Sequence, residues 1–510
     1  MKRHLLVLLA MASPALAQEP KLGTISFPTS GAAAAQPAFI RGVLYLHSFE
    51  YPSAAAAFRE AERADPGFVM AYWGEAMTYT HPVWNQQDLD SARMVLAKLA
   101  PTRQARLARA STPRERGYLE AVEELYGEGS KQRRDTLFSR AMLREMADFP
   151  GDMEARSFAA LSILGLNQGV RDVAAYMRAA AMVAPVFAAN PDHPGAAHYL
   201  IHAFDDPTHA PLGLDAARAY EHIAPDAAHA QHMTTHIFLA LGMWDETISQ
   251  NVIAADQTAY VPSHYTEWLA YGLLQAGRFT EARALIDRVE GNMTRAPRQR
   301  GEMAMMRAQY VITTETWAGQ NWNRSLDLAG LPLMAGVYRF ADGFGAVSYH
   351  DGFEAAVDDS ALTALADTLR VSGDTLAWRK LLVMGKELRA WMLFRPDSFS
   401  AAIALVRDAA AIADALPVDY GPPEIVKPAH ELLGEMLLDL HRPADAQAEF
   451  TRALVLAPGR ARSLIGLVRA ASAAGDPGVA AGAYRELAAS WHAADASLGI
   501  LAELRPQDTR

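Results

Sequence analysis

The chain has 510 residues, of which 51% are hydrophobic and 21% charged, and this composition excludes an intrinsically disordered protein. Its net charge of −11 argues against a general nucleic-acid binder, so we expect no nucleic-acid partner. Cysteine is absent, which excludes disulfides, thiol catalysis and cysteine-ligated metal, so any bound metal must be held by His, Asp or Glu.

The N-terminal residues have the pattern of a signal peptide. A basic start precedes a short apolar stretch from Leu5 to Ala12, and Ala15-Leu16-Ala17 forms an A-x-A cleavage signature. The pattern predicts a signal peptide over 1–17, cleaved after Ala17, and an N-terminal linker over 18–35. We therefore expect an exported protein, periplasmic in a diderm host or secreted. No later apolar stretch reaches the length of a bilayer span, so we expect no membrane span.

The remainder, residues 36–505, carries a repeated helical pattern. Small, aromatic and proline positions recur at the same offsets near both ends of the chain: Gly42, Ala54, Phe58, Ala61 and Pro66, then Gly434, Ala446, Phe450, Ala453 and Pro458. Small residues let two helices approach closely, the aromatic ring fills the space between hairpins, and proline breaks the chain before the next hairpin. Because one hairpin cannot bury its apolar face alone, the pattern predicts stacked hairpins around a concave groove.

These positions resemble the tetratricopeptide repeat family, most clearly over residues 36–85, 225–292 and 427–500, with degenerate repeats over 100–190 and 300–400. The resemblance implies an all-α solenoid of one continuous domain, whose first helices line a groove that binds a peptide or protein partner. The segments HPGAAHYLIHAFDDP and HAQHMTTHIF also resemble a poorly characterised exported bacterial subgroup with HPGAAHYxIHA and HxxHMxxHIF signatures. That second resemblance implies an architecture and no activity.

Histidines are concentrated in one part of the chain, where nine of the 16 lie between residues 193 and 264. Two pairs have the i,i+4 spacing that places both side chains on one helix face: His198 with His202, and His232 with His236. Because the pairs are about one repeat apart, we expect them to meet across the groove. Together they form an all-nitrogen ligand set suited to zinc, copper, iron or nickel.

Further side chains on the same predicted surface are candidates for ligand binding or for orienting the metal ligands. They are Asp205, His229, His264, Glu267 and Tyr271. If one coordination position stays open, a bound water can become a nucleophile near neutral pH, with Glu267 or His264 as the candidate general base. The sequence leaves open whether the protein is an enzyme.

Two other interpretations of the histidines stay open. In the first, His and Tyr side chains donate hydrogen bonds to a peptide or protein in the groove, without metal. In the second, the histidines only connect packed helices through hydrogen bonds.

Three weaker candidates lie outside the histidine-rich region. Trp73 is a candidate aromatic platform in the groove, although packing between hairpins is the commoner role for such a residue. Glu431 and Glu435 stand one helical turn apart and are candidates to line the far end of the groove, although a solvated acidic edge is the commoner arrangement.

Overall fold

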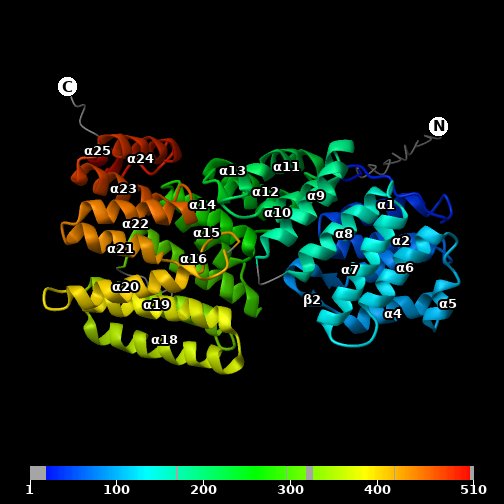
Figure 1. Ribbon diagram of the computed structural model, residues 1–510, viewed down its shortest axis with the longest axis horizontal. Coiled ribbons are helices and arrows are strands. Elements are labelled where there is room, and N and C mark those ends of the chain that lie inside the picture. The colour runs from blue at the N-terminus through cyan, green and yellow to red at the C-terminus, as the bar shows by residue number, and fades with distance from the viewer. Residues whose placement is uncertain (1–18, 168–170, 295, 318–325, 419, 506–510) are drawn as a thin grey trace, which may run out of the picture.

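The computed structural model describes residues 19–167, 171–294, 296–317, 326–418 and 420–505 (Figure 1). Within these residues the fold is all-α apart from one small antiparallel ribbon, which confirms the predicted fold class. The ribbon consists of β1 (Thr80–His81) and β2 (Gln86–Gln87), joined through the 3₁₀-helix η1 (Pro82–Trp84). The predicted signal peptide lies outside the described residues.

Helices that follow one another in the chain pack against each other along most of its length. The first half contains α1 (Gln36–His47), α2 (Tyr51–Ala64), α3 (Val69–Met77), α4 (Leu89–Leu99), α5 (Arg103–Leu107), α6 (Pro113–Leu125), α7 (Lys131–Asp148), α8 (Met153–Leu166), α9 (Val173–Ala189), α10 (Pro194–Phe204), α11 (Ala210–Ile223) and α12 (Ala228–Ala240). The second half contains α13 (Trp244–Gln257), α14 (His264–Gln275), α15 (Phe279–Gly291), α16 (Pro297–Thr314), α17 (Pro332–Ser348), α18 (Gly352–Ser372), α19 (Thr375–Leu393), α20 (Phe399–Asp414), α21 (Ala429–Asp439), α22 (Pro443–Leu456), α23 (Ala461–Ala474), α24 (Pro477–Ser490) and α25 (Ile500–Leu504).

The ring of Phe58, on α2, holds two successive hairpins together. It lies against Gly42 of α1 and Gly74 of α3, and a methyl group on these glycines would come within 2.7 and 2.3 Å of the ring. Phe58 is itself fully buried. The glycines are therefore needed for close approach, because any larger residue would push the ring out of the space between hairpins.

The same contact recurs near the C-terminus, where Phe450 of α22 lies between Gly434 of α21 and Gly466 of α23. Methyl groups on these glycines would come within 2.8 and 2.2 Å of the Phe450 ring. The recurrence of one packing unit at both ends of the chain makes the fold a tetratricopeptide-like helical repeat, as the spacing of these residues predicted.

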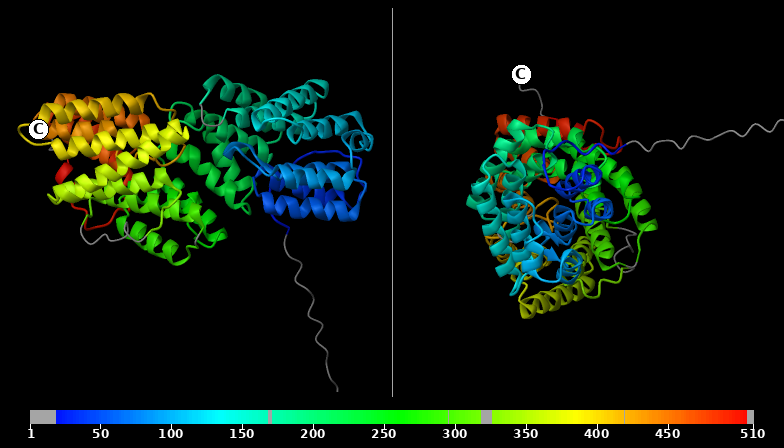
Figure 2. Two further views of the ribbon diagram at one scale, coloured as in Figure 1. Left: turned by 90° about the horizontal axis from the view of Figure 1, so that it is seen from below. Right: turned by 90° about the vertical axis from the view of Figure 1, so that its right-hand side faces the viewer.

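Buried apolar side chains form two cores, one in each half of the chain. The first core runs from Leu22 to Ala240 and the second from Trp244 to Leu504. Figure 1 shows the two halves side by side along the long axis of the molecule, with α10, α12 and α14 in the middle. In the end-on view of Figure 2, the helix pairs follow a curved path around this axis.

Contacts between distant segments close each half on itself. In the first half α1 packs against α10. In the second half, the Trp491 indole donates to the carbonyl of Gln275 at 2.8 Å, and the Trp244 indole donates to the carbonyl of Gly459 at 3.0 Å. The last repeats therefore return to the middle of the chain, and the solenoid encloses space instead of remaining an open groove.

The stretch before α1, which the sequence suggests as a linker, packs on the first half. Leu22 and Phe27 are each 2% exposed. The amide of Thr24 donates to the carbonyl of Asp192 at 2.9 Å, and the amide of Ser30 donates to Glu115 at 2.6 Å. Residues 19–35 thus belong to the folded unit. Among the described helices, none is both long and apolar enough to cross a bilayer.

Candidate metal centre

A cavity of about 540 Å³ lies where the two halves meet. Four helices contribute most of its polar wall, namely α10, α12, α14 and α16. These helices, with the end of α10, supply His202, Asp205, His229, His232, His236, His264, Glu267, Arg298 and Glu302, and Tyr176, Tyr420 and Glu424 complete the polar wall. Trp84, Trp268 and three methionines supply apolar surface. The cavity is large enough for a small organic ligand or for several water molecules.

The histidines reach this region because of how α10 and α12 begin. α10 starts with Pro194 in its first turn, and the Nδ1 atom of His193 accepts a hydrogen bond from the amide of Ala196 at 3.1 Å. This start places His198 and His202 on one face of α10, one turn apart. α12 contributes His229, His232 and His236, and α14 begins at His264.

The Nε2 atoms of His232 and His236 lie 3.3 Å apart. Nδ1 of His236 faces Oδ2 of Asp205 at 2.5 Å, and Nδ1 of His232 faces Oδ1 of Asn251 at 2.8 Å. The Asn251 amide nitrogen donates to Thr235 and to a backbone carbonyl, so Oδ1 is its acceptor. Both imidazoles must therefore donate through Nδ1. In the neutral rings each Nε2 carries a lone pair, and the two lone pairs face each other.

His198 is held in the same tautomer by the backbone. Its Nδ1 atom donates to the carbonyl oxygen of His47 at 2.6 Å, and a carbonyl can only accept. Nε2 of His198 therefore carries a lone pair. One ring nitrogen from each of His198, His202 and His229 lies within 4.8 Å of the other two. The structure thus brings the four predicted metal ligands together and adds His229 to them.

Four of these imidazoles have a buried Nε2 atom with no hydrogen-bond partner among the described residues. They are His198, His202, His229 and His264. Buried polar atoms in native proteins are nearly always paired with protein, water or an ion. Four unpaired nitrogens in one place therefore indicate that something else binds there.

Burial keeps these imidazoles neutral. Loss of solvent lowers the pKa of His198 to about 3, and lowers the pKa of His202, His229 and His232 well below the ordinary value of 6.5. The other histidines of the group lower these pKa values further, because nearby positive charges repel one another. A neutral imidazole is the form that binds a metal ion.

His264 differs from the other histidines in its tautomer. Its Nδ1 atom accepts a hydrogen bond from the Arg298 guanidinium at 3.2 Å, so the neutral ring carries its proton on Nε2. Burial, followed by the charge of Arg298, lowers the pKa of His264 to about 3. His264 is therefore suited to donate a hydrogen bond to a bound ligand and not to act as the general base suggested by sequence.

Glu267 shares its side of the cavity with a second carboxyl, that of Glu302. Burial, followed by the Glu302 charge and a hydrogen bond with Glu302, raises the pKa of Glu267 well above its ordinary value. The amide of Gln309 donates to Glu267 at 3.1 Å. The raised pKa shifts Glu267 toward its protonated form, so it fits a proton donor better than the general base expected from sequence.

An aromatic shell covers the imidazoles on the first-half side. The Phe49 ring lies 4.3 Å from the His198 ring and 5.5 Å from the His229 ring, and Trp84 lies 5.4 Å from His229. Phe49 has a φ of +56° in the turn between α1 and α2, a left-handed conformation that costs a non-glycine residue about 1–2 kcal/mol. Gly242 occupies the left-handed position of the α12–α13 turn. An aromatic ring over the histidines is thus kept at a position where glycine would be easier to accommodate.

A second group of possible ligands lies nearby but is fully hydrogen-bonded. His47 and His193 donate to the two oxygens of Glu154 at 2.7 and 3.1 Å, and His47 Nδ1 accepts from the Tyr199 hydroxyl at 2.9 Å. The Nδ1 atom of His193 accepts the hydrogen bond from the Ala196 amide at the start of α10. With every ring nitrogen paired, this buried group is explained by structure alone. It fixes His47, whose carbonyl in turn orients His198.

The remaining sequence candidates lie elsewhere. Trp73 is fully buried between Phe27 and Phe158, in the packing role that the sequence analysis gave as the commoner one. Tyr271 is buried in the second half, where its hydroxyl lies 3.2 Å from Arg460. The histidine cavity is not lined by Trp73, Tyr271 or Arg460.

The two C-terminal glutamates form a charge network in which Glu431 is buried, whereas the Glu435 side chain is 32% exposed and keeps part of the solvated edge that the sequence favoured. Glu431 is fully buried and accepts from Arg460 at 2.7 Å, while Glu435 accepts from Lys427 at 2.6 Å. Lys427 is also within 3.3 Å of Glu431. Neither glutamate lies in the wall of the histidine cavity. Arg460 and Lys427 are the basic partners that stabilise the buried Glu431 carboxylate.

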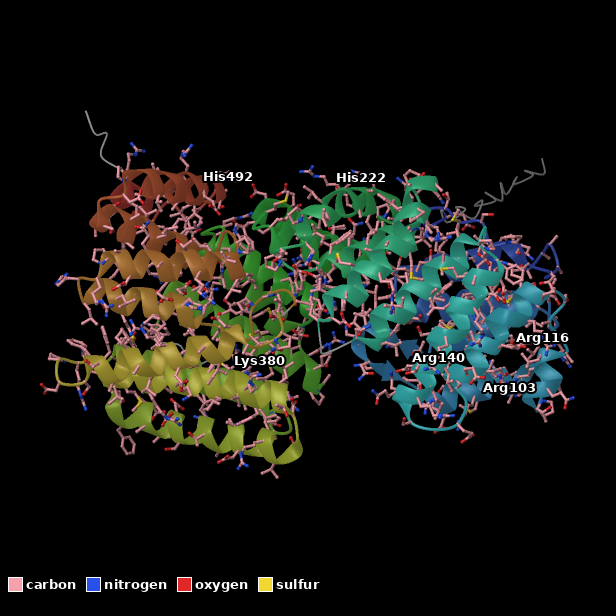
Figure 3. All side chains as sticks on the ribbon, viewed as in Figure 1. Arg103, Arg116, Arg140, His222, Lys380 and His492 are labelled. Atoms are coloured by element: carbon pink, nitrogen blue, oxygen red, sulfur yellow. The ribbon has the colours of Figure 1, made fainter. Side chains whose placement is uncertain are left out.

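Several residues that orient the imidazoles carry no signal in the sequence. They are Asn251, the carbonyl of His47 and the ring of Phe49, and the segments that contain them look like ordinary repeat sequence. Exposed histidines give a contrast: His222 and His492 have side chains 79% and 56% exposed and lie on the outer edge of the molecule (Figure 3).

No protein-family model matches the chain, and no curated protein matches it in sequence. Similar solved structures include Cut9 in the APC/C hetero-tetramer Cut9–Hcn1, with 10% identity, a TM-score of 0.29, and 93% of this chain and 97% of that chain covered. Yeast Tom70 has 13% identity, a TM-score of 0.37, and coverage of 92% and 98%. The human IFIT1 dimer with m7Gppp-AAAA has 14% identity, a TM-score of 0.35, and coverage of 92% for both chains. With scores this low, the fold description rests on the packing of the chain's own helices.

Proposed function

We propose that the protein binds a transition metal at the histidine group between its two halves. The observation that carries the proposal is the 3.3 Å separation of the Nε2 atoms of His232 and His236. Two nitrogens bound at 2.0–2.1 Å to one tetrahedral ion stand about 3.3–3.4 Å apart. When both rings are neutral their lone pairs face each other, and a cation bound between them removes that repulsion.

Three further properties support this proposal. Burial lowers the pKa of His198, His202, His229 and His232, so these imidazoles bind metal without a costly deprotonation. Their Nδ1 atoms are fixed by Asp205, Asn251 and a backbone carbonyl, which is how metal-bound histidines are commonly oriented. An all-imidazole set suits zinc, copper, iron or nickel.

The shape of the site distinguishes this proposal from a peptide-binding scaffold. A peptide groove spreads its contacts along several repeats, whereas these side chains converge on one small volume. The cavity beside them offers room for an exogenous ligand, and its wall holds the Nε2–H donor of His264 and the carboxyl of Glu267, whose pKa is raised. A bound ion would polarise such a ligand or lower the pKa of a bound water.

The proposal is tested by metal content. The mature, untagged chain is purified after exposure to zinc, copper, iron and nickel, and its metals are measured by inductively coupled plasma mass spectrometry. We expect near-stoichiometric metal in the parent and its loss in His202→Ala/His232→Ala. A matched variant, His222→Ala/His492→Ala, removes two exposed histidines and should retain the metal. A parent that holds no metal would overturn the proposal and favour a hydrogen-bonding groove for peptides.

We also propose that the protein acts after export, on the basis of the signal-peptide pattern ending at Ala17. N-terminal sequencing of the chain isolated from its own host should give a protein that begins at Gln18. A chain that retains the first 17 residues would overturn this part of the proposal.

A further inference from the structure

Five imidazoles at the junction form a closed ring. Consecutive ring centroids are 4.8 Å (His198–His202), 5.9 Å (His202–His236), 5.0 Å (His236–His232), 6.0 Å (His232–His229) and 5.2 Å (His229–His198) apart. Each of these five histidines therefore has two neighbours within the group of five. His264 stands outside it, 4.4 Å from His232.

The group of five imidazoles is too wide for all of its members to bind one ion. On a regular pentagon with sides of this length, each centroid would lie about 4.6 Å from the centre. An imidazole bound through Nε2 has its centroid about 3.1–3.2 Å from the ion, given a bond of 2.0–2.1 Å. All five rings would have to move inward by more than an ångström, against close-packed helices.

The five imidazoles divide into two groups that each suit one ion. His198, His202 and His229 each offer a nitrogen within 4.8 Å of the other two. His232 and His236 offer two Nε2 atoms 3.3 Å apart. The first group combines the α10 pair with the first histidine of α12, and the second group is the i,i+4 pair of α12 itself.

We propose that the centre is dinuclear, with one ion bound by His198, His202 and His229 and a second by His232 and His236. This inference rests on the proposed metal-binding function. Protein atoms supply three ligands to the first ion and two to the second, so both have positions left for ligands from the cavity. In two-metal sites the ions are typically about 3.5–4 Å apart, close enough to share a bridging ligand.

The cavity wall indicates the chemical class of that bridging ligand. The Nε2–H of His264 is buried without a partner among the described residues, and its ring lies 4.4 Å from that of His232. Arg298, in the same wall, adds a positive charge that Glu302 partly offsets at 3.6 Å. Two cations, one hydrogen-bond donor and one guanidinium favour an anionic oxygen ligand, such as hydroxide or a carboxylate or phosphate oxygen.

Carboxyl groups around the ring offset the added charge. Asp205 accepts from His236 at 2.5 Å, and Glu50 accepts from the backbone amide of His229 at 3.0 Å. Asp205 therefore contacts the imidazole of one ligand of the second proposed ion, and Glu50 contacts the backbone of one ligand of the first.

The number of ions per chain tests this inference. The mature, untagged chain is stripped with a chelator, refilled with Zn²⁺, and measured by mass spectrometry and by calorimetric titration. We expect two Zn²⁺ per chain in the parent and in His222→Ala/His492→Ala, and one in each of His198→Ala/His202→Ala and His232→Ala/His236→Ala. One Zn²⁺ in the parent would overturn the dinuclear centre but leave metal binding intact, whereas none would overturn both.

A second measurement needs no variant and therefore does not depend on variants folding. The parent is titrated with Cu²⁺ and followed by electron paramagnetic resonance. We expect two Cu²⁺ to bind with a signal far below that of two isolated ions, because neighbouring unpaired spins interact. A full two-spin signal of isolated Cu²⁺, or saturation at one ion, would overturn the inference.

Discussion

A 2.5 Å hydrogen bond joins Asp205 to His236. Asp205 is the residue at which α10 ends, and the bond orients the His236 imidazole on α12. The carboxylate is 3% exposed and accepts the proton on Nδ1, which leaves Nε2 of His236 directed at Nε2 of His232. A single side chain therefore connects the end of one repeat with the proposed ligand of the next.

Replacing Asp205 by Asn should weaken metal binding without unfolding the chain. An amide accepts more weakly than a carboxylate, and loss of such orienting partners commonly costs about 10–100-fold in metal affinity. Zn²⁺ affinity is measured by competition with a chromogenic chelator. The control, Asp215→Asn, changes an exposed residue on α11 and should bind like the parent. Equal affinities for the two variants would contradict the assigned role of Asp205.

Replacing Gly466 by Ala should destabilise the C-terminal repeats. The new methyl group would come within 2.2 Å of the Phe450 ring, and overpacking of this kind costs about 1–3 kcal/mol. Gly482, on the next helix, has nothing within 4 Å of a methyl group, so Gly482→Ala should be neutral or stabilise by up to about 1 kcal/mol. Urea unfolding followed by circular dichroism compares the two, and equal midpoints would contradict the close approach seen here.

Replacing Arg460 by Met should be strongly destabilising. Arg460 is 1% exposed and donates to Glu431, to the Tyr271 hydroxyl and to a backbone carbonyl. Its loss leaves a buried carboxylate short of its main partner, a change that costs about 3–5 kcal/mol. Arg469→Met is the matched control, since that side chain is 47% exposed, and it should change stability by less than about 0.5 kcal/mol. Differential scanning calorimetry provides the comparison; a small effect for Arg460→Met would argue against an ion pair in the core.

Stability should fall between pH 5 and pH 8 because of Glu145. Burial, followed by the charge of Asp152, raises the pKa of Glu145 from 4.5 to about 8, and the side chain is 3% exposed. The folded state therefore binds this proton more tightly than the unfolded state, so its contribution is complete below about pH 4.5 and is lost as pH rises through 8.

Glu145→Gln removes this titration. The variant should have a flatter dependence of melting temperature on pH, and at pH 8.5 it should exceed the parent by on the order of 2–4 kcal/mol in the free energy of unfolding. Glu120→Gln, whose side chain is 40% exposed on α6, should follow the parent curve. Parallel curves for Glu145→Gln and the parent would show that Glu145 is ionised in the folded protein.

The repeat architecture was accessible from sequence because its causes are local. Gly42, Phe58, Gly434 and Phe450 recur at fixed offsets, and the same offsets produce the same glycine-to-ring contact at both ends of the chain. The four predicted metal ligands were accessible for the same reason, since i,i+4 spacing alone puts two imidazoles on one helix face.

Other features depended on contacts between residues far apart in the chain. The sequence did not indicate two apolar cores, the return of the last repeats onto Gln275 and Gly459, or the burial of Glu431 by Arg460. It also could not show which ring nitrogen of each histidine is free. That choice is made by acceptors such as Asn251 and the carbonyl of His47.

The sequence by itself determined the all-α repeat and the histidines that face inward, because helical periodicity is a property of neighbouring residues. Only the tertiary structure decided that these side chains meet. The curvature of the stacked hairpins brings α10, α12 and α14 together between the two halves, where burial lowers the pKa of His232 and the Nε2 atoms of His232 and His236 face each other. Distances across repeats arise from the summed packing of every hairpin between them, which no local spacing encodes.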